Sequence, residues 1–215
     1  MPQIFRFADQ TTGWQNQFAV AQFNPAQGTL SAIQLRLVSN LAASAMVENH
    51  GAALAAIAVY QAATTSLTLA DGTPLASATL RANRSIAVGA ADGSDDFAGS
   101  GGARDGGQTA FTTIAATIGA AAELASFTGT GSVDLSIAAL GTGDIRGPAS
   151  FLAAIAAQSG AVVEIAYTYL VDLAASAVAV TDTTTGTSSM VTANADAGPV
   201  AKLQHQFISI APDTC

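Results

Sequence analysis

Cysteine and lysine are almost missing from this chain of 215 residues. Cys215 is the only cysteine, and Lys202 is the only lysine. A single cysteine excludes an internal disulfide and a cluster of thiolate metal ligands. With 7 basic and 15 acidic residues, the chain has a net charge of −8. It therefore lacks the dense Lys/Arg surface that neutralises phosphates, and we expect no nucleic-acid partner.

Charged residues of either sign are also few. They make up 10% of the chain, whereas about 25% is usual for soluble domains. Because half of the residues are hydrophobic and small side chains dominate, we expect a weakly hydrated surface that associates readily. No apolar run reaches about 18 residues, which argues against a transmembrane helix. The start, MPQIFRFADQTTGW, shows no recognisable signal peptide.

The residues that carry out most enzyme chemistry are scarce. The two histidines, His50 and His205, have no G-x-S-x-G element and no H-E-x-x-H spacing to accompany them. No set of acid, base and nucleophile can be assembled from the remaining residues. The sequence therefore predicts a non-enzymatic protein, with both histidines at exposed polar positions.

Apolar and polar residues alternate along much of the chain, which is typical of strands. The pattern is clear in residues 30–37 and strongest in VVEIAYTY, residues 162–169. Asp71-Gly72, between apolar runs, indicates a hairpin turn. Further turns are expected at residues 24–28, 49–51, 127–131, 141–144 and 158–160. We predict an all-β single domain, a β-sandwich of jelly-roll type with a C-terminal strand extension.

Three segments depart from simple alternation. AAAELASF (120–127) is predicted to form a short helical turn. FLAAIAAQ (151–158) fits either a helix or a strand. The segment Ala90–Gln108 is rich in glycine and aspartate, and we expect it to form one long loop.

Residues 171–215 are predicted to form an extension of the body, which spans residues 1–170. A polar spacer, Asp182–Pro199, precedes a final strand candidate, VAKLQHQFISI (200–210). This strand can close its own sheet or pair with another subunit. The apolar residues expected to mediate such assembly are Val200, Leu203, Phe207, Ile208 and Ile210.

One group of carboxylates is dense enough to suggest a metal site. Asp92, Asp95 and Asp96 lie on the glycine-rich segment, and calcium prefers such hard oxygen ligands. The spacing departs from an EF-hand, and no glutamate follows at the distance that such a loop requires. A solvated acidic loop is the favoured interpretation, calcium is the alternative, and no other cofactor is indicated.

Several sequence elements together resemble the choice-of-anchor E domain of bacterial exported proteins. The resemblance spans roughly residues 10–170 and is carried by QTTGW (10–14), QFNPAQGTL (22–30), VEN (47–49), DGSDDFAGSGG (92–102), LASFTGTGSVDLSI (124–137) and VVEIAYTY. It implies an all-β surface or matrix domain, usually with a signal peptide and a C-terminal sorting anchor. This chain departs from that pattern at both ends, where it shows no signal and carries the spacer and strand candidate in place of an anchor.

Two functions remain after these exclusions. The first is an extracellular, non-enzymatic structural protein of a bacterial surface or biofilm matrix, whose copies assemble into a filament or layer, with strand donation as one route. The alternative is a monomeric adhesin-like or carbohydrate-binding sandwich. Carbohydrate sites commonly display exposed aromatic rings. Only 6% of the residues are aromatic, with Trp14 the single tryptophan, which favours assembly.

Overall fold

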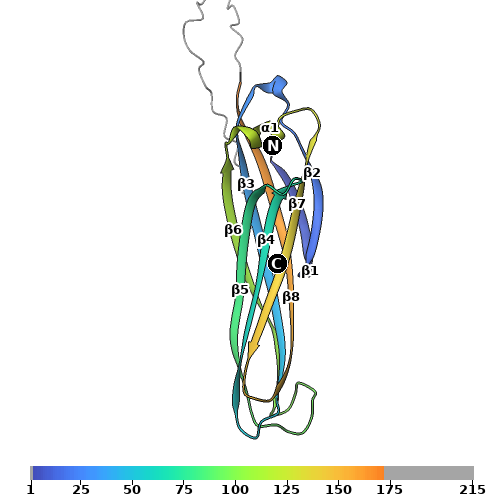
Figure 1. Ribbon diagram of the computed structural model, residues 1–215, viewed down its shortest axis with the longest axis vertical. Coiled ribbons are helices and arrows are strands. Elements are labelled where there is room, and N and C mark those ends of the chain that lie inside the picture. The colour runs from blue at the N-terminus through green and yellow to red at the C-terminus, as the bar shows by residue number, and fades with distance from the viewer. Residues whose placement is uncertain (1, 172–215) are drawn as a thin grey trace, which may run out of the picture.

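Two antiparallel four-stranded sheets pack face to face in the structure, a computed structural model that describes residues 2–171 (Figure 1). The strands are β1 (Gln3–Thr11), β2 (Trp14–Ala21), β3 (Thr29–Asn49), β4 (Ala55–Leu69), β5 (Pro74–Val88), β6 (Gly102–Ile118), β7 (Ser132–Arg146) and β8 (Phe151–Leu170). A 3-10 helix, Pro25–Gln27, and a short helix α1, Ala121–Ser126, lie in the connections. The all-β sandwich expected from the alternation is confirmed.

The strand order is that of a jelly roll. One sheet has the order β1-β8-β3-β6, and the other has the order β2-β7-β4-β5. Within these sheets β1 pairs with β8, β2 with β7, β3 with β6 and β4 with β5. The chain therefore behaves as one long ribbon of paired strands that rolls up into two layers.

The central strands are unusually long. β3 has 21 residues and β8 has 20, so at about 3.3 Å per residue each spans roughly 65–70 Å. Strands of globular proteins usually have 3–10 residues. Buried positions in β3 recur at every second residue from Ile33 to Val47, because alanines continue the alternation that the larger residues begin. The sandwich is accordingly elongated (Figure 1).

The core changes in composition along this long axis. In the part of the sandwich nearer α1 it contains Trp14, Phe23 and Phe127, and the Trp14 indole N–H donates to the carbonyl of Ser159 at 2.8 Å. Further along, inward positions are often alanine, as at Ala43 and Ala63. Small side chains at these positions add little volume between the sheets. The abundance of alanine in the sequence therefore reflects, in part, the interior of the long sandwich.

The predicted loop Ala90–Gln108 is too long at its C-terminal end. β6 begins at Gly102, and only the residues between Val88 and Gly102 lie outside strands. The pairing of β3 with β6 shifts between Ala43 and Ala45, which leaves two glycines of β6 opposite one residue of β3. Gly107 has φ of +129°, so the glycines serve a β-bulge within a strand rather than a loop.

Two predicted turns are also wrong. Residues 141–144 lie inside β7, and residues 158–160 lie inside β8. Gly160 is required for a close approach of backbones rather than for a turn. Its N–H donates to the Asn40 side chain at 2.9 Å, and a Cβ there would lie 2.8 Å from the carbonyl oxygen of Phe7.

Other local predictions are confirmed. Asp71-Gly72 forms the β4–β5 turn, with Gly72 at φ of +91° and the Asp71 carboxylate accepting the Thr73 N–H at 2.8 Å. The segment 120–127 contains α1, and the ambiguous segment 151–158 is strand. None of the helices in the described part of the chain is long and apolar enough to cross a membrane.

Candidate functional site

The first two strands cover only part of the sandwich edge on their side. β1 pairs with residues 158–165 of β8, and β2 pairs with residues 132–139 of β7. Beyond them, residues 151–157 of β8 and 140–146 of β7 have no neighbouring strand on that side among the described residues. We call these two segments the open edge. Figure 1 shows the β1–β2 hairpin ending well before the far end of the sandwich.

The turn between β1 and β2 marks where the open edge begins. The Thr12 N–H donates to the carbonyl of Ala157 at 3.0 Å, and the Gly13 N–H donates to that of Ala139 at 2.7 Å. Gly13 has φ of +104°, which glycine adopts readily. The turn therefore contacts β8 of one sheet and β7 of the other. The pairing of β1 with β8 and that of β2 with β7 both end at this turn.

Between the two open strands the interior is only partly filled. Gly141 and Gly143 occupy inward positions of β7, by the alternation of its buried residues, and both are exposed. Ile155 occupies an inward position of β8 but is 37% exposed, and its Cδ1 lies over Gly143. An inward-facing isoleucine is exposed here because no further strand covers it.

Apolar side chains also lie on the outer faces at this edge. Leu140 on β7 is 63% exposed, and Leu152 on β8 is 40% exposed. With Ile155 they place three large apolar residues on the open edge, and the segment contains few charges of its own. Unpaired backbone groups beside exposed apolar side chains are the features that an added strand uses.

The opposite side of the sandwich is cross-linked by a buried polar network. Arg84 of β5 has a side chain only 5% exposed, and its Nε lies 2.6 Å from the Asp105 carboxylate of β6. The Arg84 guanidinium also donates to the Gln61 side chain at 3.1 Å and to the carbonyl of Ala43 at 3.2 Å. Gln61 in turn donates to the carbonyl of Ala156 at 2.9 Å. The network thus reaches from β6 across the interior to the open edge.

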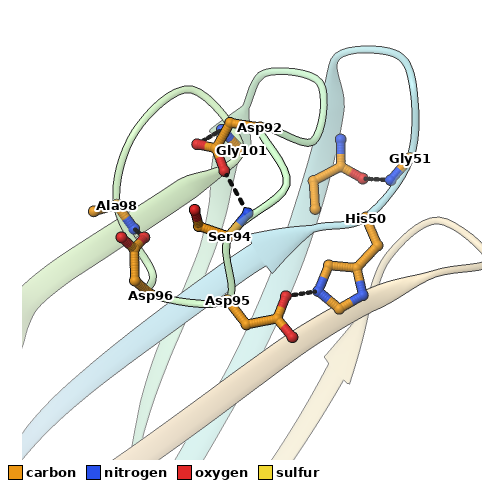
Figure 2. A network of polar contacts seen from close by, with 9 residues as sticks. His50, Gly51, Asp92, Ser94, Asp95, Asp96, Ala98 and Gly101 are labelled. Atoms are coloured by element: carbon orange, nitrogen blue, oxygen red, sulfur yellow. Dashed lines mark hydrogen bonds and ion pairs between the residues drawn. The ribbon is translucent and has the colours of Figure 1, made fainter.

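The structure separates the three aspartates of the predicted calcium group. Asp92 accepts the backbone N–H of Ser94 at 3.1 Å, and Asp96 accepts that of Ala98 at 2.9 Å. The Asp95 carboxylate lies 2.9 Å from His50 Nε2. Figure 2 shows the three carboxylates directed at different partners, with Asp92 facing both Ser94 and Gly101.

The hydrogen bonds to Asp92 affect its charge. The N–H groups of Ser94 and Gly101 stabilise the carboxylate and hold the pKa of Asp92 below its usual value. Within residues 2–171, no three His, Cys, Asp or Glu side chains are arranged to hold a metal ion together. The carboxylates of Asp92, Asp95 and Asp96 therefore do not converge on one point in the structure.

The predicted assembly residues lie outside the described part of the chain. They are Val200, Leu203, Phe207, Ile208 and Ile210.

Two features of the site were missed by sequence reasoning. The open edge depends on where β1 and β2 end relative to β7 and β8, which are more than 100 residues away in sequence. The signal in the sequence was the pair Gly141 and Gly143, which we interpreted as a turn. Glu48, a fully buried residue near the end of β3, was not singled out because it lies far from the aspartates in sequence.

A second surface feature is a groove on the outer face of the β2-β7-β4-β5 sheet. Tyr60, Arg81, Asn83 and Asp144 are among its lining residues. The Arg146 guanidinium lies over the Tyr60 ring, 5.4 Å from its centroid. The only exposed tyrosine of this groove therefore already stacks against a side chain of the same molecule.

The fold defines the class of this protein, an all-β jelly-roll sandwich, and the comparisons with known proteins add no family to it. No family model and no curated protein matches the chain. Among solved structures, an infectious bursal disease virus T13 particle matches with 13% identity and a TM-score of 0.18, over 76% of this chain and 35% of that chain. A structure of the Gx strain of infectious bursal disease virus matches with 14% identity and a TM-score of 0.17, over 77% and 36%. The chain thus spans about a third of the length of these proteins.

Proposed function

We propose that the protein is a non-enzymatic structural subunit that assembles with copies of itself by strand donation, outside the cell or on its surface. The observation that carries the proposal is the open edge, where residues 140–146 and 151–157 end both sheets without strand partners among the described residues. The proposed donor is the strand candidate at residues 200–210. The sequence resembles the choice-of-anchor E domain, which implies a surface or matrix domain, and this resemblance agrees with the proposed role.

The open edge offers the backbone groups and the apolar surroundings that such a donor strand needs. An added strand would pair with unpaired N–H and C=O groups of β8 or β7 and place alternate side chains between the sheets. In an extended segment Leu203 and Phe207 share one face, and Ile208 and Ile210 share the other. Either pair can pack beside Ile155 and Thr12, whose side chains lie over Gly143 and Gly141. Full burial of each large apolar side chain contributes roughly 1.5–3 kcal/mol.

The position of the donor favours a neighbouring subunit over the same one. β8 ends at the α1 end of the sandwich, about 55 Å from the middle of its open segment at 3.3 Å per residue. The 28 residues between Val171 and Val200 can span up to ~95 Å when extended, but a random coil of that length has an r.m.s. reach of about 30 Å. Pairing within one chain is sterically allowed but requires a stretched connection.

Carbohydrate binding by a monomer is the weaker candidate. It would use the outer groove, where Tyr60 supplies the aromatic ring. Because Arg146 already stacks on that ring, a sugar would have to displace a cation–π contact before it could bind. The groove therefore gives less support than the open edge does.

The first experiment compares the full chain with a chain that ends at Asp182. We expect the full chain to form filaments or large oligomers, and the shortened chain to stay folded and monomeric. Light scattering and negative-stain electron microscopy measure both. A monomeric full-length protein contradicts the proposal, and unfolding of the shortened chain supports a tail that closes its own sheet.

The second experiment locates the contact by disulfide trapping. Cys215→Ser removes the native thiol, and then Ile155→Cys is placed in one preparation and Phe207→Cys in another. Mixing the two under oxidising conditions should give a covalent dimer, whereas Ser85→Cys, on β5 at the opposite side, should not. A single chain carrying both Ile155→Cys and Phe207→Cys distinguishes the routes. A monomer with an internal disulfide shows pairing within the chain and contradicts donation.

A further inference from the structure

Glu48, the penultimate residue of β3, is a buried acid without a partner. Its side chain is fully buried, and neither carboxylate oxygen has a hydrogen-bond partner among the described residues. Buried polar side chains almost always have such a partner. Protonation would not remove the problem, because a carboxylic acid still presents one O–H donor and an acceptor oxygen. A bound cation would satisfy both oxygens.

The carboxylate of Glu48 is directed at the C-terminal end of the loop 89–101, which we call the acidic loop. A Cβ on Gly101 would lie 2.7 Å from Glu48 Oε1 and 3.3 Å from the carbonyl oxygen of Ala90. The Gly101 N–H donates to Asp92 Oδ2 at 3.4 Å. Two carboxylates and one backbone carbonyl therefore surround the backbone of Gly101.

We propose that this end of the sandwich binds a calcium ion, with Glu48 as the buried ligand and Asp92 as the second carboxylate. Calcium takes six to eight oxygen ligands with flexible geometry, so carbonyls of the acidic loop, such as that of Ala90, and water complete the shell. Two carboxylates balance its charge of +2. Asp92 is assigned as the ligand because its carboxylate contacts Gly101, beside Glu48, whereas Asp95 contacts His50 and Asp96 contacts Ala98.

The ion would connect two separate parts of the fold. It would attach the end of β3 to the connection between β5 and β6, at the end of the sandwich remote from α1. A site with two carboxylates and an exposed loop falls in the range of extracellular modules, with Kd of about 10⁻⁴–10⁻³ M. The inference is independent of strand donation, since neither ligand belongs to the open edge.

The experiment measures thermal unfolding and calcium titration calorimetry on the full chain, with and without chelator. For wild type, about 5 mM CaCl2 should raise Tm by roughly 3–5 °C relative to chelator. Magnesium at the same concentration should have a smaller effect, because it demands near-octahedral geometry and gives up water reluctantly. An equal magnesium shift overturns the assignment to calcium.

Glu48→Gln provides the sharpest variant, since it keeps the shape and removes the charge. In chelator its Tm should equal or exceed that of wild type, because the unpaired buried charge is gone. In calcium its Tm should fall below that of wild type, and the heat of binding should disappear. This reversal of order cannot come from a general loss of stability.

Asp92→Asn and Asp96→Asn form a matched pair on the same loop. Asp92→Asn should weaken calcium binding about tenfold or more, whereas Asp96→Asn should leave Kd unchanged. The proposal is overturned if wild type shows neither heat nor a Tm shift, if Glu48→Gln binds calcium as wild type does, or if the two aspartate variants are equally impaired.

Discussion

Some side chains of this sandwich combine close packing with a specific hydrogen bond. Tyr167 is an example, because its ring packs near Phe23 and Phe127 while its hydroxyl donates to the carbonyl of Ala21 at 2.7 Å. Burial disfavours the phenolate and raises the pKa of Tyr167 to about 12. The native state therefore prefers the protonated hydroxyl.

The alkaline stability of the protein should reflect this residue. The contribution of Tyr167 is present below pH 10, the pKa of an unperturbed tyrosine, and is lost as pH rises towards 12. Tyr167→Phe should be less stable than wild type at pH 8 by about 1 kcal/mol, for the lost hydrogen bond, but should lose less stability between pH 10 and 12. Urea unfolding at several pH values tests this, and parallel curves for the two proteins contradict it.

The sequence allowed good predictions for residues whose roles are local. Asp71-Gly72 was assigned correctly because turn chemistry depends on four neighbouring residues. Gly160 was misassigned as a turn because its role is to let β8 approach the backbone of Phe7 and the side chain of Asn40, both more than 100 residues away in sequence. Glu48 escaped notice for the same reason, since the loop that buries it lies more than 40 residues later in the chain.

At the scale of elements, the strands were predictable and their ends were not. Alternation identified β3 and β8 from short apolar stretches, but their full lengths of 21 and 20 residues depend on alanines that fit helix and strand alike. FLAAIAAQ is strand because β3 pairs with it along its whole length. Tertiary pairing, rather than local propensity, decides the state of such segments.

One buried cation, Arg84, links β5 to β6 through Asp105. Arg84→Met would leave the Asp105 carboxylate, Gln61 and the carbonyl of Ala43 without their shared donor, so we expect a loss of about 3–5 kcal/mol in the free energy of unfolding. Arg146→Met is the control. Its side chain is 75% exposed beside Asp144, and it should change stability by no more than about 1 kcal/mol. Chemical denaturation measures the free energy of unfolding of both variants. Equal losses would contradict the prediction that the buried Arg84 contributes more stability than the exposed Arg146.

For the whole molecule, the sequence predicted the fold class but not the order of the strands. Frequent turn signals indicated a sandwich or jelly roll, but the strand order depends on contacts between distant segments, such as β1 with β8 across about 150 residues. Strand termination is also a property of the whole molecule. The open edge exists because the β1–β2 hairpin is shorter than the strands that it covers, and no local pattern encodes that difference.

Net charge should control how readily whole subunits associate. Each copy carries −8, so copies repel one another over about 30 Å at 0.01 M salt but over only about 8 Å at 0.15 M. If strand donation rests on backbone hydrogen bonds and apolar burial, raising NaCl from about 10 to 150 mM should speed the assembly of the full chain without changing its end product.

The controls separate this effect from two others. Chelator present throughout keeps divalent ions from contributing. The chain ending at Asp182 should remain monomeric at both salt concentrations, which separates assembly from general loss of solubility. Time-resolved light scattering gives the rates. Slower assembly at the higher salt concentration would contradict this account, because it would show that ion pairs of opposite charge hold the subunits together.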